Sequence, residues 1–264
     1  MSRALAILLF AALAVVLRLS WALSHSPPVT APPAAPIDPT DRVAVARQEH
    51  GGAIEAKFHV VAVEYPGEIY LRWLKREALL ELWGRNRGRR FRLVATYPIL
   101  ASSGEPGPKR REGDRQVPEG FYEIDRFNPM STYHLSLGLN YPNASDLVFS
   151  DREQPGSDIF IHGSNVSIGC APLGDDAIEE VYLAALDAHA SGQTQIEVHI
   201  FPARMTGPAW EQFAANEITR RPELAPFWAQ LQPAFDFFEQ RRALPTITVA
   251  GDGRYVVPAW EKQN

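Results

Sequence analysis

The sequence predicts an α+β domain that is rich in β-strands and is followed by a helical C-terminal extension. Between residues 67 and 100, short runs rich in Ile, Tyr, Leu, Trp and Val alternate with turn signals, which is typical of a β-meander. A later segment, residues 173–192, has apolar residues at the spacing of an amphipathic helix. After Pro202 the pattern changes to two further helical stretches.

The chain has 264 residues, which is enough for one large domain or a domain and a half. A peptide-sized scaffold held together by disulfides is therefore excluded. With 45% hydrophobic and 22% charged residues, the composition is that of an ordinary globular protein. The formal net charge is only −5, whereas a general nucleic-acid binder carries a dominant basic surface. We therefore expect no nucleic-acid partner.

Residues 1–24 are predicted to be a signal peptide or a membrane anchor. A basic start precedes the apolar run 4–17, and Ala22 and Ser24 offer a small-x-small cleavage site. Arg18 interrupts the segment, and the run before it is shorter than the roughly 20 residues that a membrane span needs. Three outcomes stay open: a cleaved signal, an uncleaved anchor in the inner membrane, and a buried N-terminal helix.

Residues 25–40 are expected to form a Pro/Ala-rich tether that is extended and semi-rigid. Such a segment is suited to hold a domain away from a membrane. An exported chain that has a tether and a single cysteine suggests the periplasm of a bacterial cell envelope.

The main domain is expected to cover residues 41–206. It begins with a weakly helical segment, 41–57, and contains a loop, 102–118, that is too rich in Gly, Pro and charge to be core. Its strands are predicted at residues 69–74, 79–84, 91–99, 121–127, 133–139, 158–163 and 195–201.

The helix at residues 173–192 has the clearest pattern in the chain. Asp175 or Asp176 is expected at its N-terminal cap, and Gly192 ends it. Acidic residues in the first turn suit the positive end of the helix dipole. One apolar stripe is formed by Ile178, Val181, Tyr182, Ala185 and Leu186.

Residues 207–264 are expected to form a C-terminal extension with helices at 208–219 and 222–244 and a hairpin around Asp252 and Gly253. Aromatic residues recur at helical spacing in this extension, which favours core packing over a ligand cage. They are Trp210, Phe213, Phe227, Trp228, Phe235, Phe237 and Phe238.

The segment DIFIHGSNVSIGCAP, residues 158–172, contains the side chains best suited to catalysis. His162 ends an apolar run, and the only cysteine, Cys170, follows Gly169 just before the amphipathic helix. A thiolate is a nucleophile, an imidazole can accept its proton, and nearby backbone N–H groups can hold an oxyanion. A glycine before the nucleophile lets a substrate carbonyl approach without a Cβ in the way. The alternative is a buried, inert thiol.

No metal site is predicted. One cysteine cannot build a disulfide within the chain or a thiolate-rich zinc site, and His134, His162 and His199 lack ligand-like spacing.

The same segment resembles a known family. His-Gly followed by SIGC is similar to the signature of the L,D-transpeptidase (YkuD-type) catalytic domain, and more closely to its YafK-like branch. The similarity extends from Thr96 to Thr206, about 110 residues. It includes the stretches TYPI, GPKRREGDRQVPEGFYEI, NPMSTYHLSLGLNYPN, IFIHGSNVSIGC, IEEVY and EVHIFPARMT.

The resemblance implies a role for each residue of the motif. Cys170 matches the acyl-accepting nucleophile, His162 matches the general base, and Gly163 matches the residue after that base. Ser167 and Gly169 match the polar and glycine positions before the nucleophile. The implied fold is a curved sheet sandwich with a helix after the nucleophile, and no metal or organic cofactor is implied.

One position departs from the commoner signature of the family. Ile168 stands where many members have a second histidine, and the spacer between the two halves of the motif is short. His134 could substitute for the missing imidazole, or it could be an ordinary strand histidine. Substrate geometry on the acceptor side is therefore open.

The resemblance implies acyl transfer on peptidoglycan stem peptides through a thioester at Cys170. Backbone N–H groups near residues 168–170 would hold the oxyanion. The main alternative is a murein hydrolase or amidase that cleaves a stem cross-link or the bond to a peptidoglycan-linked lipoprotein. A third possibility, of a different class, is a catalytically silent wall-binding module.

Charge is unevenly distributed along the chain. Residues 64–115 hold 12 Lys and Arg against 7 Asp and Glu, whereas residues 140–200 hold 10 acids against one Arg. The simpler interpretation is two solvated faces of opposite charge. The functional interpretation is that the basic loop, Lys109, Arg110, Arg111 and Arg115, binds carboxylates of an acidic polymer. Lys109 and Arg111, with Tyr133 and His134, are the candidate substrate-binding residues.

Overall fold

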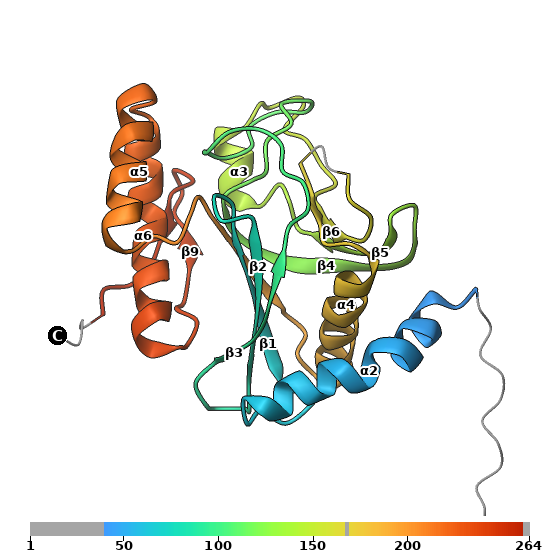
Figure 1. The fold of residues 1–264 in the computed structure, drawn as a ribbon. Helices are drawn as coiled ribbons and strands as arrows, with labels where there is room; N and C mark the ends of the chain where they lie inside the picture. Colours follow the sequence, from blue (N-terminus) through green and yellow to red (C-terminus); the bar gives the residue numbers. More distant parts are fainter. Residues whose placement is uncertain (1–39, 167–168, 261–264) are drawn as a thin grey trace, which may run out of the picture. The chain divides into compact units, whose positions relative to one another are not determined.

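A computed structural model describes residues 40–166 and 169–260 (Figure 1). They form an α+β domain around one curled sheet of eight strands in the order β3-β2-β1-β8-β4-β5-β6-β7. The strands are β1 (Glu68–Leu74), β2 (Leu79–Arg85), β3 (Arg92–Pro98), β4 (Gly120–Ser131), β5 (His134–Leu139), β6 (Phe160–His162), β7 (Ala171–Pro172) and β8 (Glu197–Phe201). The predicted fold class is confirmed.

The predicted signal segment, 1–24, and the tether up to residue 39 lie outside the described residues. Within the described part of the chain, we find no helix that is both long and apolar enough to cross a membrane.

The first half of the sheet is the predicted meander. β1, β2 and β3 pair antiparallel, and β1 also pairs with β8 in parallel, with Leu71 beside Val198. A parallel contact between strands so distant in sequence has no local signature, and the sequence did not predict it.

Strand β4 joins the two halves of the sheet. Residues 120–123 pair with β8, and the strand then continues into an antiparallel ladder with β5. The register shifts between Ile124 and Arg126, where the sheet curls. β5 then pairs with β6, and β6 pairs in parallel with the two-residue strand β7. Sequence patterns missed β7 and the short helix α3 (Ala144–Phe149), because both are too short to show periodicity.

Two helices cover one face of the sheet: α2 (Arg42–Val60), as predicted, and α4 (Asp175–Ala190), the helix after the cysteine. Their apolar residues join the strands in one buried cluster. The prediction of an Asp cap on α4 is wrong: Gly174 is the N-cap, and no side chain caps the helix. Asp175 instead accepts a hydrogen bond from the backbone of Ser164 at 2.8 Å, which ties the helix to the turn after β6.

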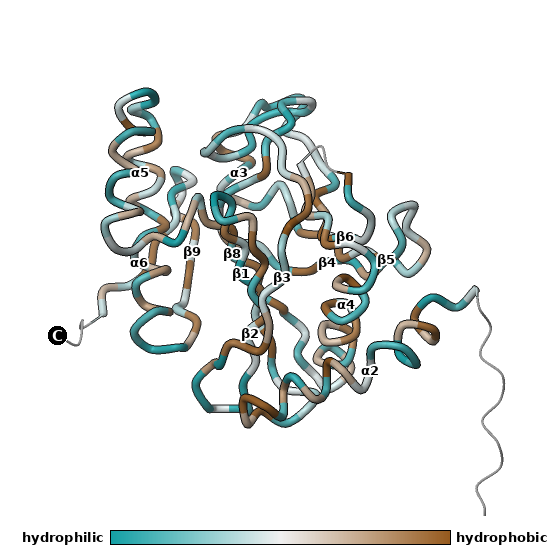
Figure 2. The backbone as a smooth tube through the Cα atoms, viewed as in Figure 1, coloured by the Kyte–Doolittle hydropathy of each residue, from teal (hydrophilic) through white to brown (hydrophobic). Residues whose placement is uncertain are grey.

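The C-terminal extension packs against the opposite face of the meander. It consists of α5 (Gly207–Arg220), α6 (Leu224–Arg241) and the predicted hairpin of β9 (Thr248–Val249) and β10 (Tyr255–Val256). Tyr70 of β1 contacts Phe238 of α6 with ring centroids 4.8 Å apart, whereas its neighbours Ile69 and Leu71 belong to the cluster under α2 and α4. β1 is therefore buried on both faces. In Figure 2 hydrophobic segments follow these central strands, and hydrophilic segments follow the loops near α3.

Candidate active site

The β6–β7 pair brings the two halves of the sequence motif together. The parallel register sets Ile161 beside Ala171 and His162 beside Pro172, and Cys170 is the residue directly before β7. Because side chains alternate along strands, extending this register by one residue places Cys170 on the same face as His162. The curled sheet therefore brings the residues that carry the imidazole and the thiol to neighbouring strands, although seven residues separate them in sequence.

The thiol of Cys170 lies at the start of β6. Its Sγ is 3.7 Å from the carbonyl oxygen of Asp158, and the residue is partly buried. Burial raises the pKa of Cys170, and the Asp158 carboxylate adds to this, whereas the Phe160 N–H and the Lys109 ammonium oppose it. The net shift is upward from the ordinary thiol value, so the isolated site holds a protonated thiol at neutral pH.

His162 is the last residue of β6 and is only 2% exposed. Its Nδ1 lies 2.5 Å from the carbonyl oxygen of Gly163. Because a carbonyl oxygen can only accept, Nδ1 carries the proton and donates the hydrogen bond. Nε2 is then the nitrogen with a free lone pair. Burial lowers the pKa of His162, and the hydrogen bond to Gly163 only partly opposes this, so the ring is neutral at pH 7.

The two predicted glycines occupy positions where a side chain would be costly. A Cβ on Gly163 would lie 2.6 Å from Asp175 Oδ1 and 2.8 Å from the Tyr133 carbonyl oxygen. Gly169 has a φ of +128°, which L side chains rarely adopt, and its Cβ position is 3.3 Å from the Gln116 carbonyl oxygen. Ser167 and Ile168 lie outside the described residues.

Tyr133 lies in the turn before β5, and His134 is the first residue of that strand. The Tyr133 ring packs against the His162 ring with centroids 4.8 Å apart and planes inclined by 33°. His134 is directed away from this contact, because its Nε2 lies 2.6 Å from Glu179 Oε1 on α4. Tyr133 therefore contacts His162 directly, whereas His134 is linked to His162 only through Tyr133.

The basic loop is more structured than its composition suggests. Lys109 is buried, and its Nζ donates to Asp114 Oδ1 at 2.6 Å and to the Arg111 carbonyl oxygen at 2.8 Å. Burial acts to raise the pKa of Asp114, but Lys109 and backbone N–H groups outweigh it and lower the pKa. Arg111 is exposed at the surface of the loop. Lys109 thus holds the loop together, whereas Arg111 faces solvent, as Arg115 also does.

A buried ion pair that sequence inspection missed fixes the other end of this loop. Lys75, just after β1, donates from Nζ to Glu119 Oε1 at 2.8 Å and to the carbonyl oxygens of Gly107 and Val117. The second oxygen of Glu119 accepts from the Trp228 indole of α6 at 2.8 Å. The C-terminal extension therefore helps to position the loop whose Gln116 carbonyl borders Gly169.

Among the described residues, one group of side chains has the composition of a metal site, and it is not at the thiol. Glu49, His50 and Glu179 meet where α2 packs against α4.

A curled sheet with a His-Gly turn beside a Gly-Cys turn defines a known class of domain. A family model described as the L,D-transpeptidase catalytic domain (YkuD) matches residues 71–198. YafK of Escherichia coli strain K12, provisionally named an L,D-transpeptidase, is 36% identical over 191 residues, which cover 72% of this chain and 73% of that protein. The protein of the same name from Escherichia coli O157:H7 matches equally. The chain belongs to the L,D-transpeptidase family.

Similar solved structures come from two other bacteria. The helical cell shape determining protein Pgp2 of Campylobacter jejuni aligns with a TM-score of 0.40 and 17% identity over 75% of this chain and 80% of that chain. Its K307A mutant aligns with a TM-score of 0.41 and 19% identity over 63% of this chain and 57% of that chain. Bd1075 of Bdellovibrio bacteriovorus aligns with a TM-score of 0.37 and 20% identity, over 67% and 61%. All these TM-scores lie below 0.5.

Proposed function

We propose that this protein is a periplasmic cysteine acyltransferase that acts on peptidoglycan stem peptides. The observation that carries the proposal is the parallel β6–β7 pair, which sets Cys170 and His162 on one face of the sheet in a chain of the L,D-transpeptidase family. Cys170 alone would not indicate acyl transfer, since a lone cysteine is more often an inert core residue.

The reaction begins with proton transfer. The thiol of Cys170 passes its proton to Nε2 of His162 as sulfur attacks the carbonyl carbon of the third, diamino-acid residue of a stem peptide. The tetrahedral oxyanion is held by backbone N–H groups at residues 169–170. Its collapse forms the thioester and breaks the amide to the following D-amino acid, whose amine takes the proton from His162. An acceptor amine then attacks the thioester, forms the new amide and returns the thiol.

The protonation states of the free site suit this sequence of steps. His162 starts neutral and Cys170 starts as a thiol, because burial disfavours the charged form of each. The thiolate is therefore generated only as it reacts, and Gly163 holds the imidazole in the tautomer that accepts at Nε2.

The basic loop gives a route to substrate recognition. Stem peptides carry carboxylates on their glutamate and diamino-acid residues, and exposed Arg111 offers them a cation at the loop surface. Tyr133 borders His162, so it can contact the chain of a bound stem. We assign Lys109 and His134 to positioning, because both are engaged within the protein.

Water as the acceptor would make the same site a hydrolase, and the amide cleaved could then join the stem to another stem or to a lipoprotein. The test is incubation of the purified full chain with defined muropeptides, and separately with lipoprotein-linked sacculi, with products read by mass spectrometry. New cross-links or exchanged D-amino acids support transfer. Released stems or released lipoprotein without transfer products support hydrolysis.

The matched control is Cys170→Ala under identical conditions. Products that form equally with this variant would contradict cysteine chemistry altogether. A wild-type chain that binds sacculi and yields no product would instead favour the wall-binding module.

A further inference from the structure

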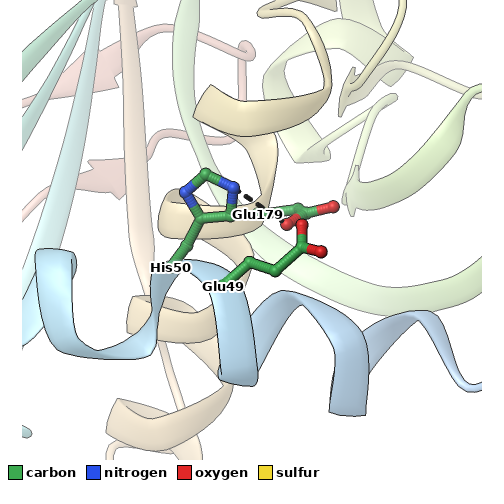
Figure 3. Close-up of side chains that lie close together, drawn as sticks. All are labelled: Glu49, His50 and Glu179. Carbon is green, nitrogen blue, oxygen red and sulfur yellow. Dashed lines mark ion pairs between the residues drawn. The ribbon is translucent and has the colours of Figure 1, made fainter.

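The interface between α2 and α4 contains a cluster of histidines and carboxylates, of which the proposed acyl transfer uses only His134, as a positioning residue. Glu49 and His50 lie on α2, Glu179 lies on α4, and His134 opens β5 beside them. One ligand atom each of Glu49, His50 and Glu179 lies within 4.8 Å of the others, and Figure 3 shows the three side chains converging between the two helices.

Charge is balanced elsewhere along this interface. Two other acids of α4 are each paired with a permanent cation of α2: Asp187 with Arg47 at 2.6 Å, and Glu180 with Lys57. Glu179 instead faces His50, and a histidine is not a permanent cation at neutral pH. Because a buried carboxylate without a countercharge is costly, this point of the interface favours an added positive charge.

The two oxygens of the Glu179 carboxylate have different surroundings. The residue is only 5% exposed, and Oε1 lies 2.6 Å from Nε2 of His134, which can donate to it. Oε2 is also buried, and within the described residues it accepts no hydrogen bond. Its neighbour is Nε2 of His50 at 3.4 Å. One oxygen is therefore fixed by a hydrogen bond, and the other is directed at an imidazole nitrogen without bonding to it.

The 3.4 Å between Nε2 of His50 and Oε2 of Glu179 is the separation expected of two ligands of one metal ion. Nitrogen and oxygen ligands lie about 2.0 to 2.2 Å from zinc, so a tetrahedral pair is about 3.4 Å apart. We propose that Nε2 of His50, Oε2 of Glu179 and the Glu49 carboxylate bind a zinc ion, with water as the fourth ligand. His134 then orients the Glu179 carboxylate through its other oxygen, the common arrangement around metal ligands.

The ion has a structural role at this position. It links the first described helix of the domain to α4, whose Asp175 fixes the turn after His162. His134 extends the link to Tyr133 and thus to the ring of His162. The proposal does not depend on the acyl transfer proposed above, because no ligand belongs to that site.

The test is zinc titration of the untagged, detergent-solubilised full chain carrying Cys170→Ala, so that the thiol cannot take up the ion. Competition with a chromophoric chelator should show one zinc per chain. Glu49→Gln and His50→Gln should each weaken binding by at least tenfold, and His134→Gln should weaken it roughly 10- to 100-fold through loss of ligand orientation. Cobalt in place of zinc should give the visible absorption of a tetrahedral site.

The matched control is His59→Gln. His59 is on the same helix, and its Nε2 is also 3.4 Å from a carboxylate oxygen, that of Glu55, but both side chains are more than half exposed. This variant should bind zinc as the parent does. The proposal is overturned if the parent binds no zinc, if His50→Gln binds with parental affinity, or if His59→Gln weakens binding as strongly as His50→Gln. Glu49 is exposed, so Glu49→Gln tests the site without endangering the fold.

Discussion

Nδ1 of His162 donates a hydrogen bond of 2.5 Å to the carbonyl oxygen of Gly163, the next residue in the chain. This contact fixes both the tautomer and the orientation of the ring without a carboxylate. A carboxylate at Nδ1 would stabilise the imidazolium and raise the pKa of His162, whereas the neutral carbonyl of Gly163 raises this pKa only weakly. Burial therefore dominates, and the lowered pKa keeps the His162 ring neutral at pH 7.

His162→Ala should slow acylation of Cys170 by roughly 10²- to 10⁴-fold, the usual contribution of a positioned acid-base group. In the wild type, the acidic limb of the acylation rate should lie below about pH 6.5, because a lowered pKa keeps the imidazole neutral to lower pH. Stopped-flow acylation across a pH series measures both effects. His189→Ala, a change at an exposed histidine of α4, is the control and should leave the profile unchanged.

Cys170 should react with iodoacetamide along a pH profile whose midpoint lies above the ordinary thiol value of about 8.5. Because it is the only cysteine, mass spectrometry can follow its alkylation without ambiguity. In urea the midpoint should fall back toward the ordinary value, since the burial that raises the pKa is lost. A native midpoint below pH 7 would instead indicate a preformed thiolate–imidazolium pair.

A carbapenem should add its mass to the wild type, because its strained acyl group is attacked as a stem carbonyl would be. Cys170→Ala should take up none. An adduct on any other residue would contradict the assignment of the nucleophile.

Local patterns predicted most of the fold. The meander, the helix α4, the helices α5 and α6 and the hairpin around Asp252 and Gly253 all show the expected periodicity or turn residues. The prediction missed features that leave no pattern in the local sequence. The parallel β1–β8 contact joins residues over a hundred positions apart, and β7 has only two residues.

For the candidate site, the motif and its chemistry predict Cys170, His162, Gly163 and Gly169, and the catalytic roles of these residues stay predictions. The burial of Lys109 could not be predicted, because a loop rich in Gly, Pro and charged residues normally lies in solvent. His50 was missed for another reason: its partner Glu179 lies on a helix that sequence inspection could not place against α2.

Gly163→Ala should lower the acylation rate by about 10²-fold, the usual cost of misplacing a catalytic group by about 1 Å. The new methyl group would meet Asp175 and the Tyr133 carbonyl, so the turn that orients His162 must move. Gly52→Ala adds the same methyl group to α2, where no atom lies within 4 Å. This control should stabilise the fold by about 0.5 to 1 kcal/mol and leave the rate unchanged.

Arg111→Gln and Lys109→Met should have different effects. Arg111 is exposed, so its loss should raise KM with little change in kcat, and the effect should fade with added salt. Lys109→Met leaves Asp114 without its cation and should cost about 1 to 3 kcal/mol of stability. It should also raise the pKa of Cys170 further, because Lys109 favours the thiolate. If Arg111→Gln kinetics match the wild type at low salt, this arginine is simply a solvated surface residue.

Trp228→Phe tests whether the C-terminal extension supports the loop beside the site. The change removes the indole N–H that donates to buried Glu119, and it should cost about 1 to 3 kcal/mol of stability. Glu119→Gln leaves the buried ammonium of Lys75 without its carboxylate and should cost about 3 to 5 kcal/mol. Burial already lowers the pKa of Lys75 and Glu119 opposes this, so the variant should be least destabilised at high pH, where Lys75 loses its proton.

Combining the two changes in a double-mutant cycle isolates their coupling. The Trp228 indole and the Lys75 ammonium both bond to the Glu119 carboxylate, so the two changes remove parts of one network. The double variant should therefore be more stable, by about 0.5 to 3 kcal/mol, than the sum of the two single costs implies. Urea unfolding followed by circular dichroism measures each corner of the cycle. Simple additivity would mean that the Trp228 indole and the Glu119 carboxylate are not coupled. Both single variants should also slow acylation, because Glu119 holds the loop whose Gln116 carbonyl lies against Gly169.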